Sequence, residues 1–231
     1  MRGVFVTGTG TEVGKTVVAA AIARSAASPG RRVAVFKPAV SGLAELNGAR
    51  PDHELLRSAA GSEQSDEEIA PYRYGPALSP HLAAALAGEQ IERAQLLLSA
   101  DHAMRGADVL VCEGVGGFLV PLAHDYLVRD LAADLRLPVV IAAPPGLGTI
   151  NHTLLTIEAV RTAGLEVSSV VLTPWPDWPR ELERGNREAI AKIGAVPVKV
   201  LPRLDLDRPA SWPRLDPGHM SSPDRVLRRA A

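Results

Sequence analysis

The sequence predicts an α/β fold, with helices on both faces of a doubly wound, mainly parallel β-sheet. Its apolar runs are short, rich in β-branched residues and do not alternate with polar residues, which is typical of strands buried on both faces. Segments with helical spacing lie between most of these runs. Strands that alternate with helices indicate parallel pairing through right-handed crossovers.

Six apolar runs are expected to be the strands of the sheet, and four segments between them are expected to be helices. The strands are predicted at residues 4–6, 33–36, 109–112, 139–142, 170–172 and 196–200. The helices are predicted at residues 16–27, 91–104, 151–163 and 180–193, where small and apolar residues recur at helical intervals.

Two stretches break this rhythm. Residues 40–80 are polar and loop-rich, and long insertions of this kind are often functional. Residues 205–231 are rich in proline and arginine and lack periodicity, so we expect a draped or partly disordered tail and favour a loose terminus. No internal repeat or linker is visible, and residues 1–204 are expected to form a single domain.

Composition and charge exclude several classes of protein. A chain of 231 residues, 46% of them hydrophobic, can bury a full core. Its 25 basic and 26 acidic residues leave a net charge of -1, which gives no electrostatic footprint for a nucleic acid or an anionic membrane surface. No apolar run approaches the roughly 20 residues that span a bilayer. The single cysteine, Cys112, and an N-terminus without a secretory layout lead us to expect a cytoplasmic protein.

The strongest signal is a glycine-rich loop, residues 8–16 (GTGTEVGKT), between the first predicted strand and the first predicted helix. Such a loop points backbone N–H groups into one concavity, the helix N-terminus adds partial positive charge, and Lys15 can reach terminal phosphates while Thr16 ligates Mg²⁺. The usual phosphate-loop pattern needs glycine where Thr9 stands, so this is a variant. A glycine-rich turn without a ligand is the alternative, and the order of strand, loop and helix disfavours it.

An acidic residue is expected to complete the metal site. Glu113 ends the run at residues 109–112 and is followed by glycines. Ligands collect at the carboxyl edge of an open parallel sheet, so its carboxylate is expected to face the phosphate loop and to bind Mg²⁺ with Thr16. An ordinary loop acid before a glycine turn is the alternative.

Lys37 ends the second apolar run and is expected at the same edge. It would give the site a second cation beside Lys15, which favours transfer chemistry because charge on a migrating group must be stabilised. It could equally extend to solvent along its aliphatic stem. The residues alone leave these two interpretations open.

Together these segments resemble the dethiobiotin synthetase family, over Gly3 to about Pro202. The resemblance is carried by six segments in order, which are residues 8–16, 37–42, Asp52 before Leu55 and Leu56, 79–81, 113–117 with Pro121 and Leu122, and 148–156. It implies a homodimeric fold of the P-loop NTPase kind. It also implies a ligase that joins 7,8-diaminopelargonate and CO₂ with Mg²⁺ and ATP or another nucleoside triphosphate, through a carbamate and a carbamic-phosphoric anhydride.

The resemblance also implies the roles of individual residues. Lys37, Lys15 and Ser41 would be catalytic, and Thr16, Asp52 and Glu113 would hold Mg²⁺. The nucleotide would be bound by Glu12, Val13, Gly14, Lys15, Thr16, Val17, Asp52, Glu113, Gly114, Val115, Gly116, Thr173, Pro174, Pro202, Arg203 and Leu204. The substrate would be bound by Thr11, Lys37, Ser41, Gly117, Gly148, Thr149 and Asn151, the last three at a helix N-terminus that receives a carboxylate across the dimer interface. Ser41 could instead be a turn residue, and for His81 and His152 we favour a packing role.

Two departures from the family pattern bear on function. Gly10 stands where the family usually has aspartate, and Thr173 stands where many members have asparagine. Threonine offers one hydroxyl where asparagine offers a donor and an acceptor, so a base other than adenine, as in CTP, is an open alternative.

Two other functions are alternatives to this interpretation. A nucleotide-switched partitioning or positioning ATPase of the P-loop class would carry an extra lysine at the position of Gly10, which is missing. An amidoligase of the cobyrinic-acid type is usually joined to a glutaminase, for which the chain has no room.

Overall fold

The computed structural model describes residues 3–218, and the central sheet confirms the predicted fold class. Six strands lie in the order β10-β9-β8-β1-β5-β2, and every pairing is parallel. The strands are β1 (Gly3–Gly8), β2 (Val33–Phe36), β5 (Val109–Glu113), β8 (Val139–Ala143), β9 (Val167–Trp175) and β10 (Val198–Pro202). The chain leaves β1 toward one side of the sheet and later crosses to the other, so a crevice is expected at the carboxyl end of β1.

Two hydrophobic clusters fill the two faces of this sheet. Along β1, Val4 and Val6 belong to one cluster and Phe5 to the other, because successive side chains of a strand point to opposite faces. The same alternation separates Val35 from Phe36 on β2. Both faces are therefore dry, which explains why the predicted strands read as continuous apolar runs.

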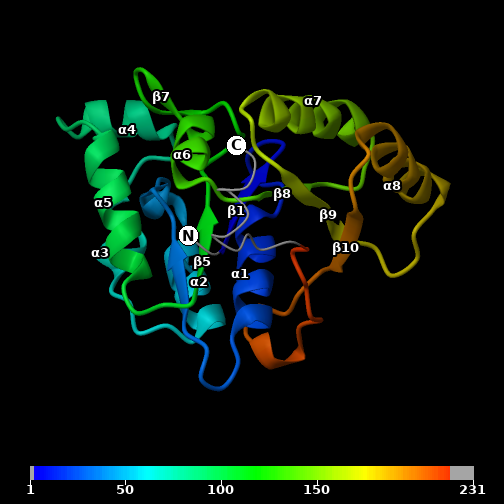
Figure 1. Ribbon diagram of the computed structural model, residues 1–231, viewed down its shortest axis with the longest axis horizontal. Helices are drawn as coiled ribbons and strands as arrows, with labels where there is room; N and C mark the ends of the chain where they lie inside the picture. The colour runs from blue at the N-terminus through cyan, green and yellow to red at the C-terminus, as the bar shows by residue number, and fades with distance from the viewer. Residues whose placement is uncertain (1–2, 219–231) are drawn as a thin grey trace, which may run out of the picture.

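Helices cover both faces. The face containing Val4 is covered by α1 (Lys15–Ala26), α2 (Asp52–Ala60) and α3 (Asp66–Ile69). The other face is covered by α4 (Pro80–Leu86), α5 (Arg93–Met104), α6 (Val128–Leu135), α7 (Thr149–Thr162) and α8 (Glu181–Gly194). Figure 1 shows α7 and α8 beside β9 and β10 at the upper right and α3 and α5 at the opposite end of the molecule. Within residues 3–218, no helix is long and apolar enough to cross a membrane.

The segment at residues 40–80 contains more regular structure than the sequence prediction gave it. It holds α2, α3, the short helix η1 (Leu43–Glu45) and the pair β3 (Ala39–Val40) and β4 (Tyr72–Arg73), which are parallel. The helix α2 begins after Pro51 and buries Leu55 and Leu56 against α1. With only nine residues and a polar outer face, its apolar periodicity is too short to detect. A second small sheet pairs β6 (Pro121–Ala123) with β7 (Tyr126–Leu127).

The edge strand β2 is completed by a side chain. The amide of Gln64 accepts a hydrogen bond from Val35 N at 2.9 Å and donates one to Val35 O at 3.1 Å. The Gln64 side chain therefore makes, at Val35, the two hydrogen bonds that a neighbouring strand would make.

The start of the tail is packed, which differs from the loose terminus expected from the sequence. Trp212 and Leu215 are buried in the cluster beneath α1, after the short helix η2 (Pro209–Ser211). Trp212 Nε1 donates to Asp205 O at 2.7 Å, and Leu215 N donates to Ser25 Oγ at 2.8 Å. Trp212 and Leu215 thus anchor this part of the tail, although its sequence shows no helical or strand periodicity. The rest of the predicted tail, residues 219–231, lies outside the described residues.

Candidate active site

Three neighbouring strands bring the candidate site residues to one edge of the sheet. β1 leads into the phosphate loop, β5 ends with Glu113, and β2 is followed by Lys37. β5 lies between β1 and β2, with Val6 opposite Glu113 and Phe36 opposite Cys112. The register therefore places the ends of all three strands at one level, as the sequence predicted.

The phosphate loop wraps the N-terminus of α1. Gly14 is the N-cap residue with φ 88°, a left-handed conformation that favours glycine, and a Cβ there would lie 2.6 Å from Thr173 Cγ2. The Lys15 side chain folds back over the loop, where Nζ donates to Gly10 O at 2.7 Å. Burial lowers the pKa of Lys15, an effect that the carboxylate of Glu113 opposes and the charge of Lys37 reinforces. The loop thus combines backbone amides, a helix N-terminus and a cation around one concavity.

Lys37 is the centre of the charged cluster. Its side chain is 4% exposed, forms an ion pair with Asp52, and places Nζ 2.8 Å from Glu113 Oε1. Burial alone would lower the pKa of Lys37, but the carboxylates of Glu113 and Asp52 outweigh it and raise the pKa above its usual value of 10.5. Lys37 is therefore a buried cation, which excludes the interpretation that its side chain extends to solvent.

Asp52 joins the cluster from α2. It is the first residue of that helix, and burial would raise its pKa, but the charge of Lys37 overcomes this and lowers the pKa below 3.8. Among the residues of its polar segment, Asp52 is indicated as a ligand only by the family resemblance. An acid directly after Pro51 is a helix-start signal that could have placed it at the end of a helix from the sequence alone.

Glu113 links the cluster to the phosphate loop. Its Oε1 accepts hydrogen bonds from Thr16 Oγ1 and Lys37 Nζ, both at 2.8 Å. Its Oε2 is buried and has no hydrogen-bond partner within residues 3–218. Burial raises the pKa of Glu113, and Lys37 opposes the shift.

The donor set fits a magnesium ion. Thr16, Asp52 and Glu113 offer hydroxyl and carboxylate oxygens, the hard ligands that Mg²⁺ prefers. The unsatisfied Oε2 of Glu113 would gain a partner, and Asp52, whose side chain is 43% exposed, leaves the site open to solvent. These are the three ligands that the resemblance implied.

A second glycine-rich loop lies against the phosphate loop. A Cβ on Gly117 would come 3.8 Å from Gly8 O and 3.9 Å from Gly10 Cα. Gly114 is buried against Phe5, while Val115 and Gly116 are partly exposed. Two backbone segments thus approach each other closely beside Glu113, at a distance that a side chain on Gly117 would reduce.

The remaining substrate residues are distributed around this centre. Thr11 and Glu12 are exposed on the phosphate loop, and Val13 and Val17 are half-buried. Ser41 is half-buried directly after β3, four residues beyond Lys37, which is compatible with either interpretation made of it.

The N-terminus of α7 follows β8, on the side of β1 away from β5. Gly148 is its N-cap with φ 90°, Thr149 is buried with its Oγ1 3.3 Å from Thr153 Oγ1, and Asn151 is exposed. Leu147, just before the helix, is 91% exposed. His81 and His152 are both exposed, so the packing role favoured for them is wrong.

The base-side segments end the last two strands. Thr173 is 3% exposed on β9 and lies against Gly14, whereas Pro174 is exposed. Pro202 ends β10, Arg203 is exposed, and Leu204 packs against the cluster beneath α1. Of these residues, Thr173 alone has a described contact with the phosphate loop.

Comparisons with known proteins agree on a family. A family model described as an AAA domain matches residues 2–213. An ATP-dependent dethiobiotin synthetase BioD of Bacillus subtilis (strain 168) is 37% identical over 205 residues, covering 88% of each chain. The protein of the same name from Bacillus cereus (strain B4264) is 39% identical over 86% of this chain and 81% of its own. That of Anaeromyxobacter dehalogenans (strain 2CP-1) is 45% identical over 74% and 76%.

Among solved structures, the MinC:MinD cell division protein complex of Aquifex aeolicus matches with a TM-score of 0.54 and 13% identity. The match covers 90% of this chain and 86% of that one. At this identity the likeness shows the P-loop fold alone and gives no support to a partitioning or positioning function.

Proposed function

The chain belongs to the ATP-dependent dethiobiotin synthetase family, and on this premise we propose that it closes the ureido ring of dethiobiotin from 7,8-diaminopelargonate and CO₂. It is thus a ligase of biotin synthesis that uses a nucleoside triphosphate. The observation that carries the proposal is the buried cluster in which Lys37 contacts both Asp52 and Glu113 while Thr16 of the phosphate loop contacts Glu113.

The proposed reaction has three steps. One amine of the diamine adds to CO₂ and loses a proton, which gives a carbamate. A carbamate oxygen then attacks the γ-phosphorus, and the bond to the nucleoside diphosphate breaks, leaving a carbamic-phosphoric anhydride. The second amine attacks the carbonyl carbon and loses a proton, which closes the ring as the bond to inorganic phosphate breaks. No side chain acts as a nucleophile.

The cluster supplies positive charge that reduces the repulsion between the two anions that react. The carbamate and the γ-phosphate are both anions, and their approach is opposed unless cations lie beside the transferred group. Lys15 and Lys37 are both buried, where charges interact more strongly than in water. Lys15 would hold the bound phosphates and Lys37 would stabilise the migrating one. Mg²⁺, held by Thr16, Asp52 and Glu113, would supply charge neutralisation on the phosphate oxygens.

The diamine is proposed to lie over the two glycine loops. Thr11, Ser41 and Gly117 would position the amine and the carbamate beside Lys37. Its carboxylate would lie at the N-terminus of α7 in a partner subunit, at Gly148, Thr149 and Asn151, because helix N-termini bind anions. The exposure of Asn151 and of the adjacent Leu147 supports a homodimer in which this end of α7 is covered.

The base of the nucleotide is proposed to bind beside Thr173 and Pro174, with Pro202, Arg203 and Leu204 on its other side. ATP is the expected substrate, and the single hydroxyl of Thr173 favours relaxed selectivity that would admit CTP. A cytoplasmic location is part of the proposal, supported by the single buried thiol of Cys112.

One assay tests the proposal. The purified protein is given bicarbonate, Mg²⁺ and each common nucleoside triphosphate, with and without 7,8-diaminopelargonate, and phosphate release is followed together with ring product. Diamine-dependent release with formation of dethiobiotin is the expected result. No product with any triphosphate would refute the ligase. Dimerisation or DNA binding driven by ATP alone would favour a nucleotide switch instead.

A further inference from the structure

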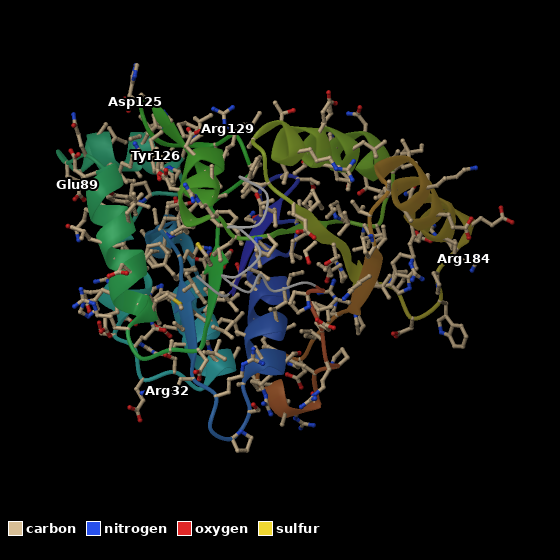
Figure 2. The ribbon with its side chains drawn as sticks, in the orientation of Figure 1. Arg32, Glu89, Asp125, Tyr126, Arg129 and Arg184 are labelled. Atoms are coloured by element: carbon tan, nitrogen blue, oxygen red, sulfur yellow. The ribbon has the colours of Figure 1, made fainter. Side chains whose placement is uncertain are left out.

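A second concave site lies at the opposite edge of the sheet from the phosphate loop. It is a cavity of about 500 Å³ where β2 begins, lined by the C-terminal ends of α2 and α5 and the loop before β5. Val33 lies in its wall at the start of β2, whereas Lys37 follows the other end of that strand. Figure 2 shows Arg32, one of its lining residues, at the lower edge of the molecule, far from Asp125 at the upper edge.

Three guanidinium groups line this cavity, those of Arg31, Arg32 and Arg105. The Nη2 atom of Arg31 is buried and has no hydrogen-bond partner among the residues that the structure describes. A buried donor without an acceptor is costly, so turning the Arg31 guanidinium toward an acceptor bound in the cavity would be favourable.

The backbone holds two of these arginines in place. Arg31 N donates to Ser28 O at 2.9 Å, and Arg32 N donates to Asp108 Oδ2 at 2.8 Å. The Arg32 guanidinium lies over Gly106, where an added Cβ would come 3.4 Å from Nη1. The side chains thus project from a fixed turn rather than from a free loop.

Two acidic residues, Glu63 and Glu68, line the cavity beside the three arginines. Glu68 accepts a hydrogen bond from Ser65 N at 2.7 Å and lies 3.4 Å from His102 Nε2. Glu63 is exposed, and Arg105 lies 3.7 Å from Asp101, with both side chains about 70% exposed. With three arginines against two glutamates, the lining keeps a net charge of +1.

We propose that this cavity binds a small organic phosphate monoester, with its phosphate on Arg31, Arg32 and Arg105. Guanidinium groups match phosphate oxygens in paired hydrogen bonds. A volume of about 500 Å³ is within the range of small-molecule sites and exceeds what an inorganic ion needs. Apolar side chains such as Val33 and Ala60 offer a surface for the organic part.

Isothermal titration of the full chain tests this site. The active site is first saturated with Mg²⁺ and a non-hydrolysable ATP analogue, so that the phosphate loop is occupied. Phenyl phosphate is then titrated, with phenol as its uncharged analogue. We expect one phenyl phosphate per chain, bound at least about tenfold more tightly than phenol, because hydrogen bonds between charged groups are stronger than those of a neutral hydroxyl.

Matched variants locate the binding. Arg31→Gln with Arg105→Gln should weaken phenyl phosphate at least about tenfold, whereas Arg184→Gln, on the exposed surface of α8, should leave it unchanged. If the double variant does not fold, Arg105→Glu alone gives the same test, because its side chain is 70% exposed. Phenyl phosphate that fails to bind, that binds no better than phenol, or that binds the variants equally well would overturn the proposal.

Discussion

Lys37 directly follows β2 and Glu113 ends the neighbouring parallel strand β5, with Nζ 2.8 Å from Oε1 and with side chains that are 4% and 0% exposed. Removing two such charges from water is expensive, and a buried ion pair is often no more stable than apolar residues of equal volume. Breaking the pair by removing one partner, however, leaves an uncompensated charge. The arrangement is therefore better explained by its position beside the phosphate loop than by its contribution to stability.

Lys37→Ala should abolish turnover while the nucleotide still binds. Lys37 is proposed to act on the transferred group, whereas Lys15 and the loop amides hold the phosphates. We expect phosphate release to fall at least about 100-fold, and nucleotide affinity to change by less than about threefold. Release assays and titration with a fluorescent nucleotide measure the two quantities. Lys192→Ala, at an exposed position on α8, is the control. Equal loss of both quantities in a folded Lys37 variant would contradict this division.

Glu113→Gln should raise the Mg²⁺ concentration needed for activity. The substitution keeps the shape of the side chain but removes the negative charge that Thr16 and Lys37 contact. We expect at least about a tenfold higher half-saturating Mg²⁺ concentration, as is usual when a metal site loses a ligand or its support. A Mg²⁺ titration of phosphate release measures it, with the exposed Glu188→Gln as control. An unchanged titration curve would remove Glu113 from the metal site.

Thr173→Asn should increase selectivity for adenine. Thr173 lies against Gly14 of the phosphate loop, and an asparagine amide would add both a donor and an acceptor at this position. We expect the ratio of kcat/KM for ATP to that for CTP to rise about tenfold, the effect of one hydrogen bond of about 1.4 kcal/mol. Steady-state kinetics with both nucleotides measure it. A ratio that does not move would place the base elsewhere.

Trp212→Ala should destabilise the fold although the residue lies beyond the expected domain. Trp212 is 8% exposed and its Nε1 donates to Asp205 O at 2.7 Å. We expect a loss of about 3 to 5 kcal/mol in the free energy of unfolding, which is typical when a buried aromatic side chain is removed. Urea unfolding measures it. Trp178→Ala is the control, since Trp178 is 90% exposed, and it should change the value by less than about 0.5 kcal/mol. Equal effects at both positions would contradict the packing of the tail.

Asp134→Asn should reduce stability at neutral pH but not in acid. Hydrogen bonds from Arg93, followed by one from Tyr126, lower the pKa of Asp134 below its ordinary 3.8. Figure 2 shows Tyr126 at the upper edge of the molecule, near Asp125. A carboxyl with a lowered folded-state pKa contributes stability above its unfolded value, and this contribution is lost as pH falls through the folded value. We expect a cost of about 1 kcal/mol at neutral pH.

Urea unfolding between about pH 7 and about pH 3 should show the wild-type and Asp134→Asn free energies converging as the pH falls. The exposed Asp125→Asn variant should follow the wild-type curve throughout. A difference that stays constant with pH would mean that Asp134 acts through its shape alone.

The central sheet could be predicted from the sequence because its strands are buried on both faces. The first strand is an example, because it buries three consecutive apolar residues, Val4, Phe5 and Val6. An uninterrupted apolar run of this kind is expected only in a buried strand or a buried helix. The phosphate loop and Glu113 follow from the same regularity, since both lie where a predicted strand ends. The burial of Lys37 could not be predicted from the sequence. It depends on ion pairs with Asp52 and Glu113, which lie 15 and 76 positions further along the chain.

Short elements escaped prediction for a different reason. The helix α6 has eight residues and α4 has seven, so neither gives more than about two turns of pattern. Their places are determined by contacts such as those of Leu131 and Ala84 with the core. Asn151 remains a prediction, because its proposed partner belongs to a second subunit.

The Gln64 amide has a consequence for self-association. An edge strand with free backbone groups is a template on which another chain can add a strand. In β2, the N–H and C=O of Val35 that face outward are already bonded to one side chain. An incoming strand would have to displace this amide before it could form its first pair of hydrogen bonds. The end of the sheet is thereby protected from edge-to-edge aggregation, without a covering helix or an extra strand at that residue.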